Sequence, residues 1–138
     1  MHTQNGRLTM STVVNILLVA VGGGAGAVVR YSMALALSRV SLTMPWGTLM
    51  ANWAGCFLMG LVAAVTGRGL PLSPAARLLL TTGFCGGLTT FSTFMFELHT
   101  LASAREVFYG TIYFVASVGG SAMAFVMGLV VVHICIRQ

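Results

Sequence analysis

The stretch from Gly83 to Phe94 constrains this chain most, because it places small and polar residues inside a run long enough to cross a membrane. It reads GFCGGLTTFSTF, with three glycines and four hydroxyl side chains, and the uncharged run around it extends from Leu78 to Phe96. Glycine weakens a helix. A backbone group freed inside the hydrocarbon layer needs a partner within the protein or in a water-filled cavity. The stretch therefore predicts a helix broken at mid-membrane, which is typical of a binding or conduction site.

The composition also indicates a membrane protein. The chain is 57% hydrophobic and 7% charged, with a mean hydropathy of +0.94, whereas a soluble domain carries about 25% charged residues. Its net positive charge comes from seven arginines, which are spread along the chain, against the two acidic residues Glu97 and Glu106. Basic residues that bind nucleic acid are usually clustered, so we expect no nucleic-acid partner. We also expect no enzyme, since a chain of 138 residues is one domain without room for a soluble enzyme beside a membrane bundle.

Four uncharged runs divide the chain into the spans of an all-α membrane protein. We expect a single domain with four transmembrane helices, at about residues 10–36, 48–66, 77–101 and 107–134. Each run is near the length of about 20 residues that a helix needs to cross the bilayer. Gly22 and Gly26 form a GxxxG pair, as do Gly83 and Gly87. This spacing lets helix backbones approach closely and suits either a compact bundle or a homodimer.

The arginines are distributed almost evenly over the two sides of the membrane that four spans define. One side holds Arg7, Arg68, Arg77 and Arg137, and the other holds Arg39 and Arg105 with Arg30 at its edge. Orientation follows an excess of basic residues in the cytoplasmic loops, and four against three is almost no excess. The chain therefore either inserts both ways up or takes one topology, set by four arginines against two if Arg30 is not counted.

Polar residues recur at helical spacing in three of the runs. They are Thr48 and Asn52 in the second run, Thr89 and Thr93 in the third, and Tyr113, Ser117 and Ser121 in the fourth. A single Ser or Thr in a membrane helix is commonly satisfied by its own helix carbonyls. The amide of Asn52 has two donors and an acceptor, which its own helix cannot satisfy so locally. The three stripes together predict a hydrogen-bonding path through the protein.

The residues of this path favour an anion. Cation pathways usually need carboxylates inside the membrane, and the one candidate is Glu97, near the end of the third run. Hydroxyl, amide and backbone N–H groups are donors, which suit an anion. Phe91 and Phe94 lie three residues apart, on roughly one helix face, and an aromatic ring has a positive edge. Ordinary helix packing explains the same spacing.

Two other functions stay open on the residues alone. A small proton-coupled multidrug exporter would need a carboxylate in the first run, and residues 8–29 contain none. A non-transporting membrane assembly subunit would need neither a broken helix nor three polar stripes.

The motifs resemble those of the Fluc (CrcB) fluoride channels. Residues 83–94 look like the signature of the family's third helix, and residues 22–31 (GGGAGAVVRY) resemble its first helix. Residues 45–49 (PWGTL), followed by Asn52 and Gly55, resemble the second helix, and Tyr113, Ser117 and Ser121 match polar positions of the fourth. The resemblance covers essentially all four spans and leaves out residues 1–7. Met95 departs from it, because relatives often carry Ser there.

The resemblance implies an antiparallel, dual-topology homodimer with two pores in the bacterial inner (plasma) membrane. Its role would be passive export of cytoplasmic fluoride, which confers fluoride resistance. Backbone carbonyls of Gly86 and Thr89 from both subunits would hold a structural sodium ion at the dimer interface. Arg30 and Glu97 would lie at the vestibule. The pore residues that the resemblance implies are Phe91, Phe94, Asn52, Thr48, Ser92, Thr93, Tyr113, Ser117 and Ser121.

Overall fold

The structure is a computed structural model that describes residues 2–40 and 43–136. Seven helical segments make up these residues: α1 His2–Leu37, α2 Trp46–Gly67, α3 Pro74–Leu78, the π-helix η1 Leu79–Cys85, α4 Gly86–Leu88, α5 Phe91–Ser103 and α6 Val107–Cys135. Four helical stretches in the described residues are long and apolar enough to cross a membrane: Ser11–Leu37, Trp46–Gly67, Pro74–Ser103 and Val107–Cys135. The expectation of an all-helical chain with four possible membrane spans is confirmed.

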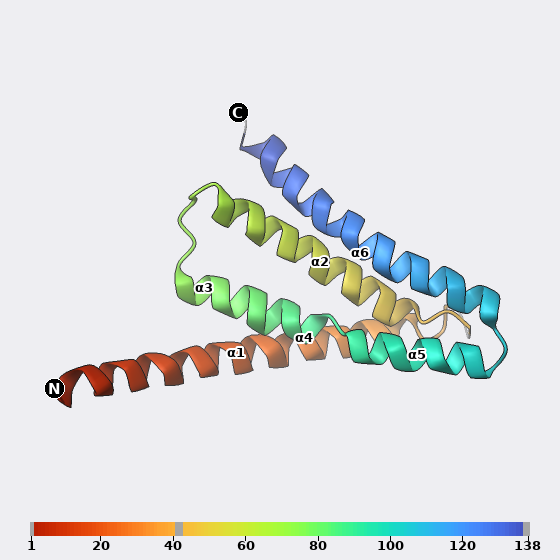
Figure 1. The fold of residues 1–138 in the computed structure, drawn as a ribbon, viewed down its shortest axis with the longest axis horizontal. Helices are drawn as coiled ribbons and strands as arrows, with labels where there is room; N and C mark the ends of the chain where they lie inside the picture. The colour runs from red at the N-terminus through yellow and green to blue at the C-terminus, as the bar shows by residue number, and fades with distance from the viewer. Residues whose placement is uncertain (1, 41–42, 137–138) are drawn as a thin grey trace.

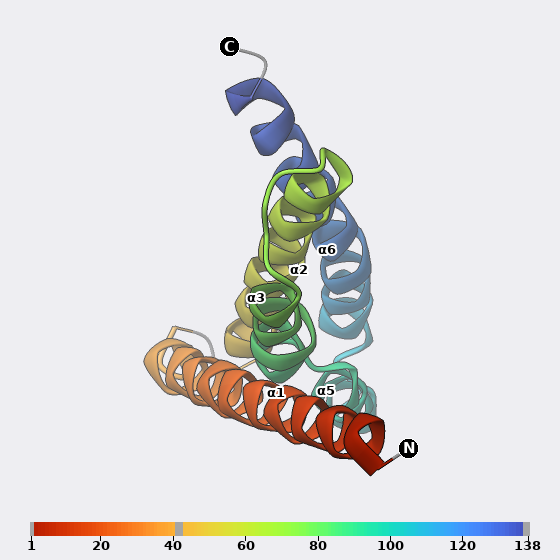
Figure 2. The same cartoon turned by 90° about the vertical axis from the view of Figure 1, so that its left-hand side faces the viewer.

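The four stretches alternate in direction, so that both ends of the described chain lie at one end of the bundle (Figure 1). Helices α2 and α6 lie side by side and run the same way. Helix α1 packs on the segment formed by η1 and α4, and it crosses the other helices obliquely (Figure 2). The loop between α2 and α3 lies at the end opposite to the junction of α5 and α6.

Glycines set how closely these helices approach. A Cβ atom added to Gly60 of α2 would overlap the carbonyl oxygen of Phe125, and one added to Gly128 of α6 would overlap that of Phe57. The GxxxG pairs of the sequence meet each other in the same way. Cβ atoms on Gly26 and Gly87 would overlap backbone carbonyl oxygens across the contact of α1 with η1 and α4. The two GxxxG pairs therefore pack against each other within one chain, and the backbones touch where no side chain intervenes.

The start of the third membrane stretch has a clear local cause. Ser73 is extended, its Oγ accepts a hydrogen bond from the N–H of Ala76 (3.1 Å), and Pro74 occupies the first helical position. A Ser cap followed by Pro is a strong helix-starting signal, because Pro has no N–H to leave unsatisfied there. The helix then runs as α3, η1 and α4 as far as Leu88.

Candidate functional site

The helix of the third stretch is interrupted at two residues. Helix α4 ends at Leu88, Thr89 (φ −84°, ψ 152°) and Thr90 (φ −151°, ψ 123°) are extended, and α5 begins at Phe91. The N–H of Thr89 still donates to the carbonyl oxygen of Cys85 (2.9 Å), four residues earlier. The helical pattern stops after this bond, so the backbone groups of Thr90 need other partners.

Asn52 of α2 supplies partners for Thr90. The N–H of Thr90 donates to Asn52 Oδ1 (2.7 Å), and Asn52 Nδ2 donates to the carbonyl oxygen of Thr90 (3.2 Å). The Asn52 amide thus satisfies both the N–H and the carbonyl group of Thr90. Asn52 is the polar residue that the sequence singled out as unable to satisfy itself on its own helix, and its partner is the interruption.

The side chain of Thr90 caps the helix that follows. Its Oγ1 accepts a hydrogen bond from the N–H of Thr93 (3.2 Å) and donates to Thr93 Oγ1 (3.1 Å), and it lies 3.3 Å from Ser92 Oγ. An extended Thr whose oxygen accepts from the third helical residue is a strong N-cap. The N-terminus of α5, with its partial positive charge, therefore faces the interruption.

The interruption also releases backbone carbonyls, among them those of Gly86 and Thr89. In a continuous helix the N–H groups of Thr90 and Thr93 would donate to the carbonyls of Gly86 and Thr89. Here those N–H groups donate to side-chain oxygens of Asn52 and Thr90 instead. The carbonyl oxygens of Gly86 and Thr89 thereby lose their helical donors and suit a bound cation better than ordinary helix carbonyls do.

Arg30 lies on the other side of the same segment. Its Nε donates to the carbonyl oxygen of Gly87 (3.2 Å), and its side chain is half-buried. A guanidinium at the last carbonyls of a short helix stabilises the negative end of that helix. The structure therefore places this predicted vestibule residue against the backbone next to the interruption.

A cavity of about 340 Å³ lies beside the interruption. Its lining joins α2, the interruption, α5 and α6, and consists of Asn52, Cys56, Thr89, Thr90, Phe91, Phe94, Ser117, Val118 and Ser121. Ser117 is buried, and its Oγ has no hydrogen-bond partner within the described residues. Buried polar atoms are almost always paired, so this enclosed hydroxyl is a polar group next to the cavity whose hydrogen bonding is incomplete.

The two predicted phenylalanines differ sharply in burial. Their ring centroids are 5.7 Å apart with planes tilted by 48°, but Phe94 is 2% exposed and Phe91 is 73% exposed in the single chain. Phe94 also packs on Tyr113, with centroids 5.2 Å apart. Phe94 is thus a core residue that borders the cavity, whereas Phe91 presents its ring outward beside it.

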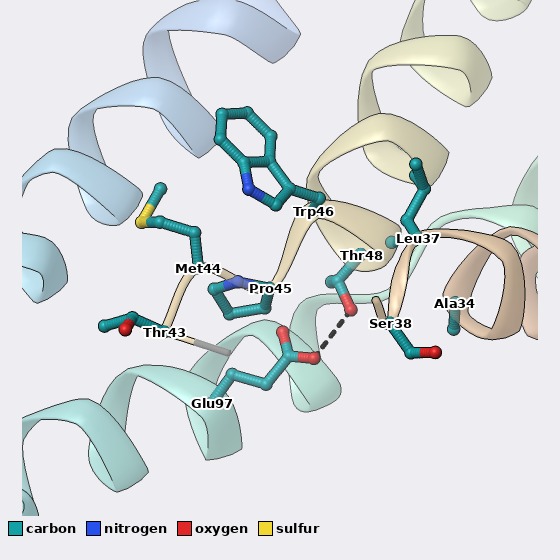
Figure 3. Close-up of a pocket in the computed structure, with 10 residues that line it drawn as sticks. Ala34, Leu37, Ser38, Thr43, Met44, Pro45, Trp46, Thr48 and Glu97 are labelled. Atoms are coloured by element: carbon teal, nitrogen blue, oxygen red, sulfur yellow. Dashed lines mark hydrogen bonds between the residues drawn. The ribbon is translucent and has the colours of Figure 1, made fainter. Parts of the chain in front are cut away.

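Other predicted residues gather around a carboxylate instead of the cavity. Thr48 Oγ1 donates to Glu97 Oε1 (2.8 Å), and the hydroxyl of Tyr113 donates to Glu97 Oε2 (2.6 Å). Figure 3 shows the Thr48 and Glu97 side chains pointing towards each other beside a second cavity of about 220 Å³. The role of Glu97 as the common acceptor for two stripes was not predicted. Its position directly after the uncharged run, four residues before the end of the expected third span, was the available signal.

The structure thus divides the predicted residues into two clusters. The first surrounds the interruption and its cavity, and contains Asn52, Thr89, Phe91, Phe94, Ser117 and Ser121, with Ser92 and Thr93 in the cap of α5. Thr90, at the centre of this cluster, was not among the predicted site residues. The second contains Thr48, Glu97 and Tyr113. The contact between Phe94 and Tyr113 joins them. Both clusters together can offer hydroxyl, amide and ring-edge contacts along one side of the bundle.

The sequence is similar to a family of known proteins over most of its length. The model of the family described as "CrcB-like protein, Camphor Resistance (CrcB)" matches residues 17–129. A protein of Chlorobium phaeobacteroides (strain BS1), named fluoride-specific ion channel FluC, is 43% identical over 114 residues, which cover 83% of this chain and 89% of the relative. Proteins of the same name from Chlorobium luteolum and Rhizobium etli (strain CFN 42) are 45% and 44% identical, over 84% and 87% of this chain and 90% and 97% of each relative.

Proposed function

This chain belongs to the CrcB-like family, and on that premise we propose that it is a fluoride channel that lets cytoplasmic fluoride leave the cell passively. One observation carries the proposal. The chain is 40–46% identical to fluoride-specific channels over most of its length. It also has a cavity whose wall combines an amide, hydroxyls and phenylalanine rings. Hydrogen fluoride enters cells as a neutral acid and dissociates inside, so a passive exit for the anion confers fluoride resistance.

The chemistry of the cavity supports an anion in particular. Asn52, the free hydroxyl of Ser117 and the N-terminal end of α5 offer donors or positive potential. No carboxylate lines this cavity. Phe91 and Phe94 can turn ring edges, which are positive, towards the ion. We propose that these residues, with Ser121, contact or guide fluoride, and that the Thr48–Glu97–Tyr113 cluster borders the path at its vestibule, with Arg30 nearby.

Family membership favours this function over the two alternatives. A proton-coupled exporter would need an acidic residue in α1, where the sequence has none. A non-transporting assembly subunit would not need a buried hydroxyl, such as that of Ser117, without a hydrogen-bond partner beside a cavity.

We further propose that the protein works as an antiparallel, dual-topology homodimer with two pores in a bacterial inner membrane. The near-even distribution of arginines supports two orientations. The outward ring of Phe91 is free to reach a second chain, so that each pore contains rings from both subunits. In this arrangement the interruption at Thr89 and Thr90 lies at mid-membrane.

The same dimer offers a site for a structural sodium ion. The carbonyls of Gly86 and Thr89 from two chains would give four main-chain oxygens on the dimer axis, without a carboxylate. Such a set suits a monovalent cation better than calcium, which takes about 6–8 oxygens that often include carboxylates. An experimental structure of the dimer tests this proposal: an axis without an ion would contradict it.

The decisive experiment is fluoride efflux from liposomes that contain the purified protein. We expect fluoride to leave faster than from empty liposomes, without a pH gradient, and chloride to leave much more slowly. If reconstituted protein released fluoride no faster than empty liposomes, the channel would be ruled out. A strict requirement for a proton gradient would favour the exporter.

A further inference from the structure

A third, separate cavity of about 320 Å³ lies between α2 and the α3–η1 segment, at the end of the bundle that holds the loop between them. Figure 1 shows α2 and α3 diverging towards this loop. The cavity is lined by Met59, Val62, Ala63, Thr66, Arg77 and Thr81, among others, and it shares no residue with the cavity beside Asn52. We call it the α2–α3 groove.

The polar mouth of the α2–α3 groove has one free donor group. Thr66 Oγ1 donates to the carbonyl oxygen of Val62 (2.8 Å), and Thr81 Oγ1 donates to that of Arg77 (2.8 Å). Both hydroxyl protons are therefore used within their own helices. Arg77 is exposed, and within residues 11–40 and 43–136 its guanidinium forms no hydrogen bond or ion pair. Five N–H donors in a planar fork are thus available to an anion, and phosphate geometry matches them.

The charge around the groove also favours an anion. The only acidic side chains of the sequence are Glu97 and Glu106. Glu97 hydrogen-bonds to residues near the start of α2 and α6, and Glu106 directly precedes α6, so both lie towards the opposite end of the bundle. The neighbouring Arg68, at the end of α2, contacts His133 of α6. Among the described residues, the end of the molecule that holds Arg77 therefore carries positive charge without an acidic side chain to neutralise it.

The floor of the groove is apolar and extends into the membrane span. Met59, Val62 and Ala63 lie on α2 before Thr66, and Met59 is about 10 Å from Thr66 along the helix, at about 1.5 Å per residue. Going inward from Arg77, the groove thus changes from a charged mouth to a hydrocarbon wall. This order matches a molecule with an anionic head and an acyl chain.

We propose that the α2–α3 groove binds one anionic phospholipid, with its phosphate on Arg77 and an acyl chain against Met59, Val62 and Ala63. Basic pockets between membrane helices are known to hold anionic head groups, and each basic residue near the surface contributes about 1 kcal/mol. A free phosphate ion would leave the apolar floor uncovered. The proposal stands on the groove alone and does not depend on fluoride conduction.

The test measures lipid affinity on the purified full-length protein by native mass spectrometry. The probes are dimyristoyl phosphatidylglycerol and the zwitterionic phosphatidylcholine with the same chains. We expect phosphatidylglycerol to bind more tightly. Arg77→Gln should weaken its binding about five- to tenfold, which corresponds to the loss of one charge-assisted contact. Arg77→Lys should recover part of the affinity.

Two further variants separate the parts of the site. Ala63→Phe fills the apolar floor and should also weaken phosphatidylglycerol binding, whereas Arg39→Gln removes an arginine at the opposite end and should leave it unchanged. A thermal melt of each variant identifies loss of folding, and Arg77→Gln, an exposed substitution, keeps the test valid if Ala63→Phe unfolds. Equal affinity for the two lipids, or unchanged binding by Arg77→Gln, overturns the proposal. Equal stabilisation by inorganic phosphate alone also overturns it, because the acyl chain would then have no role.

Discussion

Asn52 and Thr90 exchange two hydrogen bonds across the space between α2 and the third membrane stretch, at 2.7 and 3.2 Å. One amide therefore satisfies both backbone groups of a residue that has left the helix. Without it, a half-buried N–H and a half-buried carbonyl would lose these partners, which costs up to about 1–3 kcal/mol for each group. The contact thus ties the shape of the candidate pathway to a single side chain on a neighbouring helix.

The first prediction concerns Asn52→Asp. The substitution replaces the Nδ2 donor by an oxygen that faces the carbonyl of Thr90, and it places a negative charge beside the proposed anion path. We expect fluoride flux to fall at least about tenfold, which requires only about 1.4 kcal/mol of added barrier. Fluoride efflux from liposomes is the measurement.

The matched control for this prediction is Asn15→Asp, the same change at an exposed position of α1. It should keep most of the flux, since Asn15 does not line the cavity beside the interruption. Similar losses in both variants would show that added charge alone disrupts the protein, and normal flux in Asn52→Asp would remove Asn52 from the path.

The second prediction concerns Phe91→Ile and Phe94→Ile. Both keep apolar bulk and remove a ring edge, so we expect each to reduce fluoride flux, by up to about tenfold for a lost aromatic contact. Their effects on stability should differ, because Phe94 is buried against Tyr113 and Phe91 is 73% exposed. Flux assays and thermal melts on the same preparations measure both effects.

Phe96→Ile is the control for the phenylalanines. Phe96 lies on the same helix, is 70% exposed, and does not line the cavity beside Asn52. Its replacement should leave flux near the wild-type value. If all three variants conducted normally, the rings would have only a packing role.

The glycines of the third span show where reasoning from sequence was incomplete. They indicate a weakened helix, yet Gly83, Gly86 and Gly87 are all helical, and the extended residues are Thr89 and Thr90. The missing side chains at Gly83 and Gly87 instead let α1 approach the backbone. Helix spacing depends on which helices are neighbours, and a single sequence does not contain that information. The threonines leave the helix because Asn52 and their own side chains replace the lost hydrogen bonds.

The polar stripes were easier to predict than their partners. Helical spacing grouped Asn52 with Thr48 and Ser117 with Ser121, and Asn52, Ser117 and Ser121 line one cavity. The same reasoning grouped Tyr113 with Ser117, although the hydroxyl of Tyr113 donates to Glu97 on α5. Periodicity determines which residues share a face of one helix. The rotation of that helix relative to its neighbours is determined by packing over many residues, including close contacts such as that between Gly60 and Gly128.

The third prediction concerns the α2–α6 contact. A methyl group at residue 128 would overlap the carbonyl oxygen of Phe57, so Gly128→Ala must push α2 and α6 apart. Overpacking of this kind costs about 1–3 kcal/mol. We expect a clearly lower melting temperature in detergent. Gly119→Ala, on the same helix, meets no atom within 4 Å and should be neutral or stabilising by about 0.5–1 kcal/mol. Equal melting of the two variants would contradict this account of the contact.

The fourth prediction concerns the carboxylate of Glu97. Tyr113→Phe removes the donor to Oε2 in a fully buried position, and we expect a loss of about 1–3 kcal/mol in stability. Glu97→Gln should also destabilise the fold, and the double variant should lose less than the sum of the two single losses, because the residues are directly coupled. Thermal unfolding of the four proteins in the cycle provides the values.

Tyr109→Phe, a 41% exposed position one turn earlier, is the control and should have little effect. Additive losses would mean that the contact contributes nothing.

The last prediction concerns topology. Four arginines against three give almost no orientation bias, so we expect the chain to insert both ways up. Leu70 lies in the loop between α2 and α3, and a cysteine there, in a chain whose three native cysteines are replaced, should react with an impermeant thiol reagent from both sides of the membrane. About half the sites should react before permeabilisation and the remainder after it, because nearly equal numbers of arginines on the two sides favour nearly equal insertion frequencies. Labelling from one side alone would refute dual topology. It would also remove the basis for the sodium site, since only an antiparallel pair brings two interruptions, each with released carbonyls at Gly86 and Thr89, to one point on a shared axis.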